Sequence, residues 1–169
     1  MQRLPYARQL ELERRDPQSR RASLLGLGLA LDGLAGVRGR AVEVGELQFP
    51  QGGKPRCAGG ESFSISHTTR RVAVAVSGDC DVGIDVEEVG ATGEPGAGAS
   101  GRLERWTMVE AVLKAAAAGL RHAREVQLDG AALRARLGDR EFFLRRLELG
   151  PGVVAHLATT ARVESVRYD

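Results

Sequence analysis

The stretch that constrains this chain most is residues 82–87, Val-Gly-Ile-Asp-Val-Glu, whose alternating β-branched residues predict a short strand. Residues two apart in a strand project from the same face, so Asp85 and Glu87 point the same way. Their backbone positions are about 6.6 to 6.8 Å apart, a separation at which two carboxylates repel each other and a divalent cation could bridge them. Gly83 lets another group approach the backbone. The pair is therefore either two solvated acids on an edge strand or part of a cation site.

The length of the chain suits one globular domain or two small packed lobes. Its 169 residues are 43% apolar and 27% charged, which is enough apolar material for a core. No apolar run reaches the roughly 18 residues of a membrane span, and the N-terminus lacks the apolar segment of a signal peptide. We therefore expect a cytoplasmic protein that does not enter a membrane, with Cys57 and Cys80 as reduced thiols.

The positive charge of the chain is small and unevenly distributed. A net charge of +2 is too low to favour nucleic-acid binding, although residues 1–40 hold eight arginines against four acids. Of the 24 cationic residues, 22 are Arg and only Lys54 and Lys114 are Lys. Against this Arg-rich background, we expect a lysine to mark a position that needs a compact ammonium group.

The first clear element is a helix that begins at Asp16-Pro17, an N-cap acid followed by proline at the first helical position. Leucines between residues 24 and 34 form its apolar stripe, which stops near the glycines at 33 and 36. Arg20 and Arg21 lie in the first turns of this helix. They either belong to a solvated face or face a phosphate near the helix N-terminus.

Two strands and a loop follow. Residues 41–49 alternate apolar and polar and predict a half-buried strand, and the Gly- and Pro-containing loop after it presents Lys54. Residues 63–68 predict a second strand that ends in Ser66, His67 and Thr68. Because neighbours on a strand face opposite sides, Ser66 is poorly placed for activation by His67, and anion binding is the better hypothesis for this motif.

The second half begins with a Gly-, Ala- and Pro-rich tract at residues 90–101, which we interpret as a flexible connector. Residues 102–120 predict a helix in which Glu110 and Lys114 are adjacent on one flank. The expected apolar stripe of this helix consists of Leu103, Trp106, Val109, Leu113 and Leu120. Further strand patterns cover residues 71–77, 140–149 and 152–160.

Four motifs in order carry a family resemblance: Gly53-Lys54-Pro55, then Phe-Ser-Ile-Ser-His-Thr at 63–68, then residues 82–87, then Trp106-Thr-Met-Val-Glu110-Ala-Val-Leu-Lys114. Together they resemble the motif series of the 4′-phosphopantetheinyl transferases of the surfactin-synthetase type, relatives of holo-acyl-carrier-protein synthase. The match runs from about residue 16 to residue 160, and both lysines of the chain fall on motif positions.

This resemblance implies an α+β fold of two similar lobes with pseudo-twofold symmetry, here residues 1–81 and 82–169. The family moves the 4′-phosphopantetheine arm of coenzyme A (CoA), bound between the lobes, onto a serine of a carrier protein and requires Mg²⁺. The implied partners are CoA and an acyl or peptidyl carrier protein, with no nucleic acid and no membrane. With a site inside one chain, we expect a monomer.

The resemblance also assigns roles to individual residues. It implies CoA-binding roles for Lys54, Pro55, Ser66 and His67, with Arg20 and Arg21 from the segment that is similar to the family's N-terminal helix. It implies Mg²⁺ ligation by Asp85, Glu87 and Glu110. Glu110 would also be the base for the carrier serine, and Lys114 would contact the diphosphate.

Three positions depart from the family pattern. Val109 stands where the family usually has lysine, Ala117 replaces a glycine, and the segment before Trp106 is shortened to the connector. These departures bear on rate and carrier docking more than on CoA binding. A catalytically weak or inactive CoA-binding module with a regulatory or docking role therefore stays an alternative, and an Arg-rich nucleic-acid binder is a more distant one.

Overall fold

The computed structural model describes residues 4–50, 53–90, 97–129 and 131–167. The helices are α1 (Tyr6–Glu13), α2 (Pro17–Arg38) and α3 (Ala97–Ala116), with 3₁₀ turns η1 (Val44–Glu46) and η2 (Leu120–Glu125). The strands are β1 (Leu47–Gln48), β2 (Arg56–Cys57), β3 (Ser62–His67), β4 (Val72–Ser77), β5 (Val82–Glu88), β6 (Gln127–Asp129), β7 (Arg134–Leu137), β8 (Arg140–Arg146) and β9 (Val153–Thr159). The predicted α+β class is confirmed.

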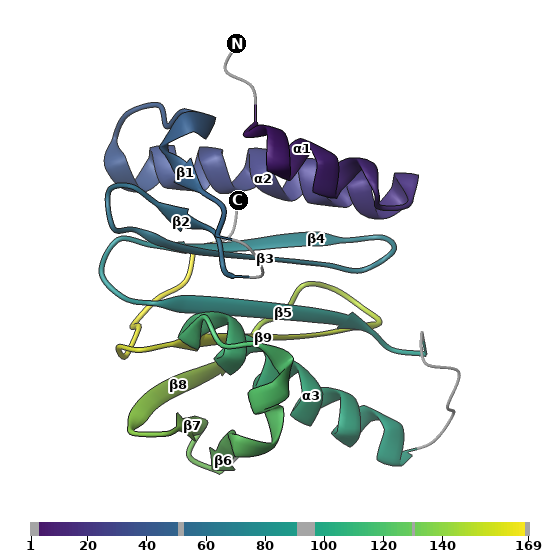
Figure 1. Ribbon diagram of the computed structural model, residues 1–169. Coiled ribbons are helices and arrows are strands. Elements are labelled where there is room, and N and C mark those ends of the chain that lie inside the picture. Colours follow the sequence, from purple (N-terminus) through teal and green to yellow (C-terminus); the bar gives the residue numbers. More distant parts are fainter. Residues whose placement is uncertain (1–3, 51–52, 91–96, 130, 168–169) are drawn as a thin grey trace.

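Helices flank the strands on two sides (Figure 1). Helix α2 covers the antiparallel pair β3–β4, and α3 packs on β5 and β9 of an antiparallel sheet with the order β5-β9-β8-β7-β6. One apolar cluster lies under α2 around Leu34 and Phe63, and another lies under α3 around Val112 and Phe142. A third cluster joins Ile84 and other residues of β5 and β9 to alanines of β4, so apolar packing continues across the expected lobe boundary.

The start of α2 is as predicted, and its end is later. The side chain of Asp16 accepts a hydrogen bond from the amide of Ser19 at 2.9 Å, and Pro17 is the first helical residue. The helix continues past the glycines and stops at Arg38, because Gly39 takes the left-handed conformation with φ of 67°. Gly33 is a packing residue, since a Cβ there would lie 2.8 Å from the side chain of Val76.

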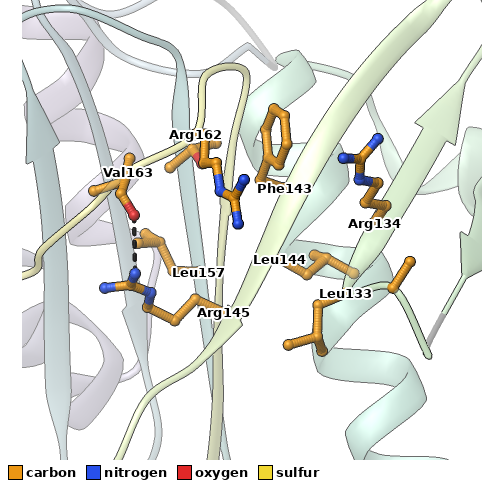
Figure 2. Close-up of a pocket in the computed structure, with 10 residues that line it drawn as sticks. Leu133, Arg134, Phe143, Leu144, Arg145, Leu157, Arg162 and Val163 are labelled. Carbon is orange, nitrogen blue, oxygen red and sulfur yellow. Dashed lines mark hydrogen bonds between the residues drawn. The ribbon is translucent and has the colours of Figure 1, made fainter.

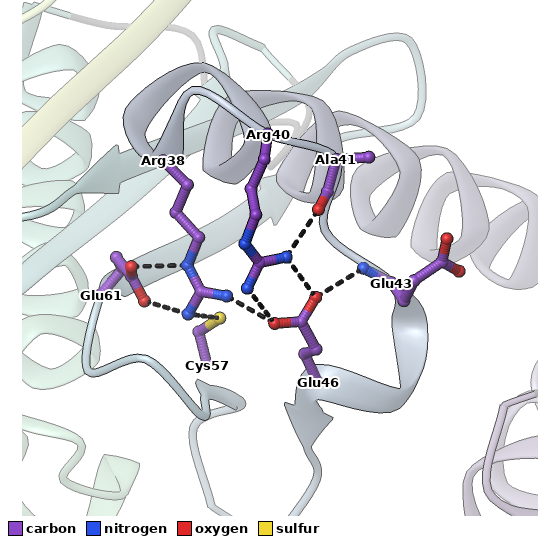
Figure 3. A network of polar contacts seen from close by, with 7 residues as sticks. All are labelled: Arg38, Arg40, Ala41, Glu43, Glu46, Cys57 and Glu61. Carbon is purple, nitrogen blue, oxygen red and sulfur yellow. Dashed lines mark hydrogen bonds and ion pairs between the residues drawn. The ribbon is translucent and has the colours of Figure 1, made fainter.

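The strand predicted for residues 41–49 is wrong over most of its length, because polar contacts fold residues 44–46 into a 3₁₀ turn (Figure 3). The carboxylate of Glu46 accepts hydrogen bonds from Arg38 at 2.6 Å and from the amide of Glu43 at 3.0 Å. It also accepts one from Arg40 at 2.8 Å. The Arg40 contact, followed by the Glu43 amide, lowers the pKa of Glu46 to about 2. Only two residues of this segment remain in a strand.

Helix α3 differs from the prediction both in where it begins and in which face it buries. It begins at Ala97, within the tract expected to be a connector, and ends at Ala116; residues 91–96 of that tract lie outside the described residues. Trp106 and Leu120 were expected inside and are 41% and 61% exposed. The helix instead buries a broader face made largely of small side chains: Thr107, Val109, Ala111, Val112, Leu113 and Ala115. Small alanines suit this face because α3 approaches the backbone of β5 closely at Gly83.

The other strand predictions hold with small changes of length, at β3, β4, β5, β8 and β9. The sequence patterns missed α1 and the short elements β2, η2, β6 and β7. Within the described parts of the chain, no helix is both long and apolar enough to cross a membrane.

Candidate functional site

The site begins at the junction of β3 and β5, which is made by serine hydroxyls. The side chains of Ser62, Ser64 and Ser66 accept hydrogen bonds from the amides of Val82, Ile84 and Val86 at 3.0, 3.1 and 3.3 Å. Every second residue of β3 thus faces the edge of β5, and the alternation of the Ser-Phe-Ser-Ile-Ser sequence explains this arrangement. The junction fixes Ser66 beside the acidic face of β5.

Asp85 is buried, so the interpretation of this pair as two solvated acids is wrong for Asp85. Its side chain is 3% exposed and faces Lys114 on α3. The Oδ1 atom accepts hydrogen bonds from the hydroxyl of Ser66 at 2.9 Å and from Nζ of Lys114 at 2.5 Å. The Oδ2 atom is also buried and accepts no hydrogen bond within the described residues. An orphaned carboxylate oxygen of this kind is costly to bury, so it favours a further positive partner.

Glu110 and Glu87 complete an acidic cluster with Asp85. Lys114 Nζ lies 3.6 Å from Glu110 Oε2. Burial, followed by the charge of Asp85, raises the pKa of Glu110 above its ordinary value. Burial and then the carboxylates of Asp85 and Glu110 likewise raise the pKa of Glu87. Three carboxylates here share one ammonium, so the cluster is short of positive charge.

This cluster is not a preassembled metal cage. Over residues 4–50, 53–90, 97–129 and 131–167, no three His, Cys, Asp or Glu side chains are placed to hold a metal ion together. The donors nevertheless fit Mg²⁺, which prefers a few carboxylates plus phosphate oxygens. The buried Oδ2 of Asp85, which has no hydrogen-bond partner among the described residues, and the partly buried carboxylates of Glu87 and Glu110 suit such an ion. These are the three residues that the resemblance assigns to the metal.

A basic cavity of about 280 Å³ adjoins the cluster at Lys114. Its charged or titratable lining residues are Arg8, Arg15, Lys54, His67 and Lys114, and no Asp or Glu of the described residues lines it. Pro55, Ser64 and Leu113 are among the other lining residues. A concave surface with cations and without carboxylates suits an anionic ligand.

The side chain of Lys54 is partly buried and hydrogen-bonded, whereas its position in a Gly- and Pro-containing loop suggested an exposed side chain. Its ammonium donates hydrogen bonds to the hydroxyl of Ser62 at 2.9 Å and to the carbonyl of Val82 at 2.5 Å, while its side chain lines the cavity. Burial lowers the pKa of Lys54 to about 8. Burial and then the nearby charges of Arg15 and Lys114 lower the pKa of His67 below its ordinary value. At neutral pH, the lysine is therefore the charged group and the histidine is a neutral hydrogen-bonding partner.

The structure brings Lys54, Pro55, His67 and Lys114 together around the cavity, with Ser66 behind them against Asp85. Arg20 and Arg21 are not among the lining residues. Arg8 from α1 and Arg15 from the turn before α2 line the cavity instead, and Arg15 donates to the hydroxyl of Ser23 at 2.8 Å. The available signal was the helical spacing of Arg8, Glu11 and Arg15, because Glu11 pairs with both arginines.

His156, which belongs to no sequence motif, lies beside the cluster. It is the strand partner of Asp85 on β9 and is 1% exposed. Its Nδ1 atom is 2.7 Å from the hydroxyl of Thr107, a fully buried residue of α3. The contact links β9 to α3 behind the carboxylates. A long-range pairing between residues 85 and 156 cannot be read from local sequence.

A comparison of the chain with protein-family models found no match, and a comparison with curated proteins found no similar sequence.

Proposed function

We propose that this protein transfers 4′-phosphopantetheine from CoA to a serine of an acyl or peptidyl carrier protein. The single observation that carries the proposal is the position of Lys114, which pairs with Asp85 at 2.5 Å and also lines the basic cavity. One ammonium thus stands between a place for phosphates and a place for a divalent cation. That juxtaposition is what phosphoryl transfer from a diphosphate needs.

The cavity would hold the phosphates of CoA. Lys54, Arg8 and Arg15 supply positive charge, and His67 supplies a hydrogen bond. Guanidinium groups match phosphate oxygens in bidentate geometry, whereas an ammonium acts as a point charge. Lys114 would contact the diphosphate at the end of the cavity next to the carboxylates.

The chemical step exchanges one P–O bond for another. The hydroxyl oxygen of the carrier serine attacks the phosphorus that bears the pantetheine arm, and a new O–P bond forms. The bond from that phosphorus to the bridging oxygen breaks, and adenosine 3′,5′-bisphosphate leaves with the electron pair. Glu110 accepts the serine proton, since its carboxylate lies beside Lys114, at 3.6 Å, where the cavity meets the acidic cluster.

Asp85, Glu87 and Glu110 would hold Mg²⁺, which when bound supplies positive charge for the diphosphate. The proposed enzyme has two similar lobes, residues 1–81 and 82–169, related by a pseudo-twofold axis. A helix packed on antiparallel strands in each half, α2 on β3–β4 and α3 on β5–β9, supports it. We also propose that this enzyme is cytoplasmic and monomeric.

The test is the intact mass of apo carrier proteins after incubation with CoA, Mg²⁺ and this protein. We expect an acyl or peptidyl carrier protein to gain the mass of one phosphopantetheine, and we expect Glu110→Gln to abolish most of that gain. A panel of both carrier classes that gains no mass, under conditions where CoA binds, would refute the transferase.

A CoA-binding module without catalysis is the second candidate. The observation that favours it is the same ion pair, because Lys114 already occupies Oδ1 of Asp85, one of the oxygens expected to face a metal. Binding of CoA that is unaffected by Mg²⁺, together with no mass gain on any carrier, would select this candidate.

A further inference from the structure

A second cavity lies on the face of the five-stranded sheet opposite α3 (Figure 2). Its volume is about 270 Å³, and β7, β8, β9 and the tail after β9 enclose it. Phe143 and Leu157 project from this face, since the alternate residues Phe142 and Ala158 pack under α3 on the other face. It shares no lining residue with the basic cavity beside Lys114.

Three arginines contribute to the wall: Arg134 on β7, Arg145 on β8 and Arg162 after β9 (Figure 2). Within the part of the chain that the structure describes, no Asp or Glu lines this cavity. Among the residues that the structure describes, none of the three forms an ion pair with a carboxylate. By contrast, Arg140 and Arg146 at the two ends of β8 pair with acids at 2.7 and 2.6 Å. The cavity therefore concentrates positive charge that the described residues do not neutralise.

Two of these side chains are already held in place. Arg145 donates to the carbonyls of Val163 at 2.8 Å and Glu164 at 3.3 Å, which fixes the tail as one wall of the cavity. The guanidinium carbon of Arg134 lies 5.3 Å from the ring centroid of Phe143. A ligand that binds here has less side-chain freedom to remove, because the positions are set in advance.

We propose that this cavity binds a small phosphate-bearing molecule with at least two negative charges. Guanidinium groups bind phosphate oxygens through paired hydrogen bonds, and a single carboxylate would balance only one of the three cations. Enclosure by the tail suits a compact ligand better than an extended nucleic-acid strand, which needs a continuous groove. The inference does not depend on phosphopantetheinyl transfer.

The test is a titration of the whole protein with inorganic pyrophosphate, followed by amide chemical shifts in NMR spectra. Shifts are expected at Arg134, Leu144 and Val163. Pyrophosphate that binds the other cavity moves a different set of amides, near Lys54 and His67, so the two sites are read separately. An absence of saturable shifts in the first set at millimolar pyrophosphate overturns the proposal.

Variants decide whether the arginines act through this cavity. Replacing both exposed arginines, Arg134→Gln with Arg162→Gln, is expected to weaken the binding seen at these amides by about tenfold or more, since each charged hydrogen bond is lost. Arg136→Gln is the matched control, because Arg136 is exposed on the same strand and opposite Glu141. It should change the affinity less than about twofold. Equal losses in the control and the double variant overturn the proposal.

A third arm uses single-stranded oligonucleotides of increasing length. An oligonucleotide that moves the same amides and binds more tightly as its length grows would assign the surface to nucleic acid and overturn the small-ligand proposal. Pyrophosphate that competes equally with short and long oligonucleotides, with no gain from length, supports the small-ligand proposal.

Discussion

The ammonium nitrogen of Lys114 lies 2.5 Å from Oδ1 of Asp85 and joins the carboxylate cluster to the basic cavity. Ser66 bridges the same two groups, since it donates to Asp85 and accepts from Lys114 at 3.1 Å. The pair is asymmetric in burial, because the side chain of Lys114 is 29% exposed and that of Asp85 is 3% exposed. Loss of either partner therefore leaves a partly buried charge without its counter-ion.

Asp85→Ala is expected to lower the free energy of unfolding by about 1 to 3 kcal/mol, because Lys114 and Ser66 both lose a buried partner. The measurement is urea unfolding followed by circular dichroism. Asp85→Asn is the control, since it keeps the shape and a hydrogen-bond acceptor while removing the charge. An Asp85→Ala protein with an unchanged midpoint would show that Asp85 is solvated in solution, as an edge-strand acid would be.

Gly83 is expected to tolerate no side chain. A Cβ at this position would meet the carbonyl oxygen of Ala111 and the amide of Ala115, both backbone atoms of α3 that cannot move alone. Gly83→Ala should therefore cost about 3 kcal/mol of stability. Gly28→Ala is a control of opposite sign, because Gly28 lies in α2 with nothing within 4 Å of its Cβ position. It should stabilise by about 0.5 to 1 kcal/mol, and thermal unfolding of both variants measures the contrast.

Removal of one serine hydroxyl from the junction of β3 and β5 is expected to destabilise the fold. Ser64 is buried and accepts the Ile84 amide at 3.1 Å, so Ser64→Ala leaves a buried N–H without its acceptor. A loss of about 1 to 3 kcal/mol is expected in chemical denaturation. The exposed Ser165 offers a matched control, and Ser165→Ala should change stability by less than about 0.5 kcal/mol. Equal effects of the two substitutions would mean that the junction contributes nothing.

Local sequence patterns predicted the helices and strands that are determined by interactions between residues close in the sequence. Asp16 and Pro17 fix the start of α2 through capping, and the alternation of β3, β4 and β5 reflects one face packed on neighbours. The turn at Val44–Glu46 was not predicted, because it depends on Arg38 and Arg40 reaching Glu46. The exposure of Trp106 depends on which face of α3 docks on β5 and β9, which is a tertiary property.

The candidate site also combines residues that the sequence singled out with contacts that depend on packing. The sequence singled out Lys54, His67 and Lys114, which line one cavity, but spacing along the chain could not show that Arg8 and Arg15 join them. Nor could it show that Asp85 is buried against Lys114, since residues 29 positions apart meet only after α3 docks on β5. Contacts of this range follow from packing and not from any local pattern.

The low pKa of Lys54 predicts pH-dependent CoA binding. Burial lowers the pKa of Lys54 from 10.5 to about 8, so the free protein loses this cation as the pH rises through 8. CoA affinity should fall between pH 7 and pH 9.5, a range in which the ligand's phosphates stay ionised because their last pKa is about 6. Calorimetric titration at several pH values measures this. Lys54→Arg should flatten the profile, because a guanidinium stays charged.

Stability should follow the opposite trend through the same group. Because the folded pKa of Lys54 lies below its unfolded value, the unfolded chain binds more protons between pH 8 and 10.5. The contribution of Lys54 to the free energy of unfolding therefore rises with pH over that window. A Lys54→Met protein should lack this rise, and an identical pH profile in wild type and Lys54→Met would contradict the assignment.

The last prediction concerns Val109 and its neighbour Glu110. Val109 is 6% exposed in the apolar cluster under α3, so it is a packing residue here. Val109→Lys buries an ammonium and should cost about 3 kcal/mol of stability, whereas Val109→Ile should cost less than about 1.5 kcal/mol. Glu110 is only partly buried and faces Lys114, so Glu110→Gln should keep the fold and CoA binding while removing most turnover. Thermal unfolding, CoA titration and the carrier mass assay measure these outcomes. A stable Val109→Lys protein with faster turnover would place position 109 at the reacting groups, and wild-type turnover in Glu110→Gln would remove Glu110 from the mechanism.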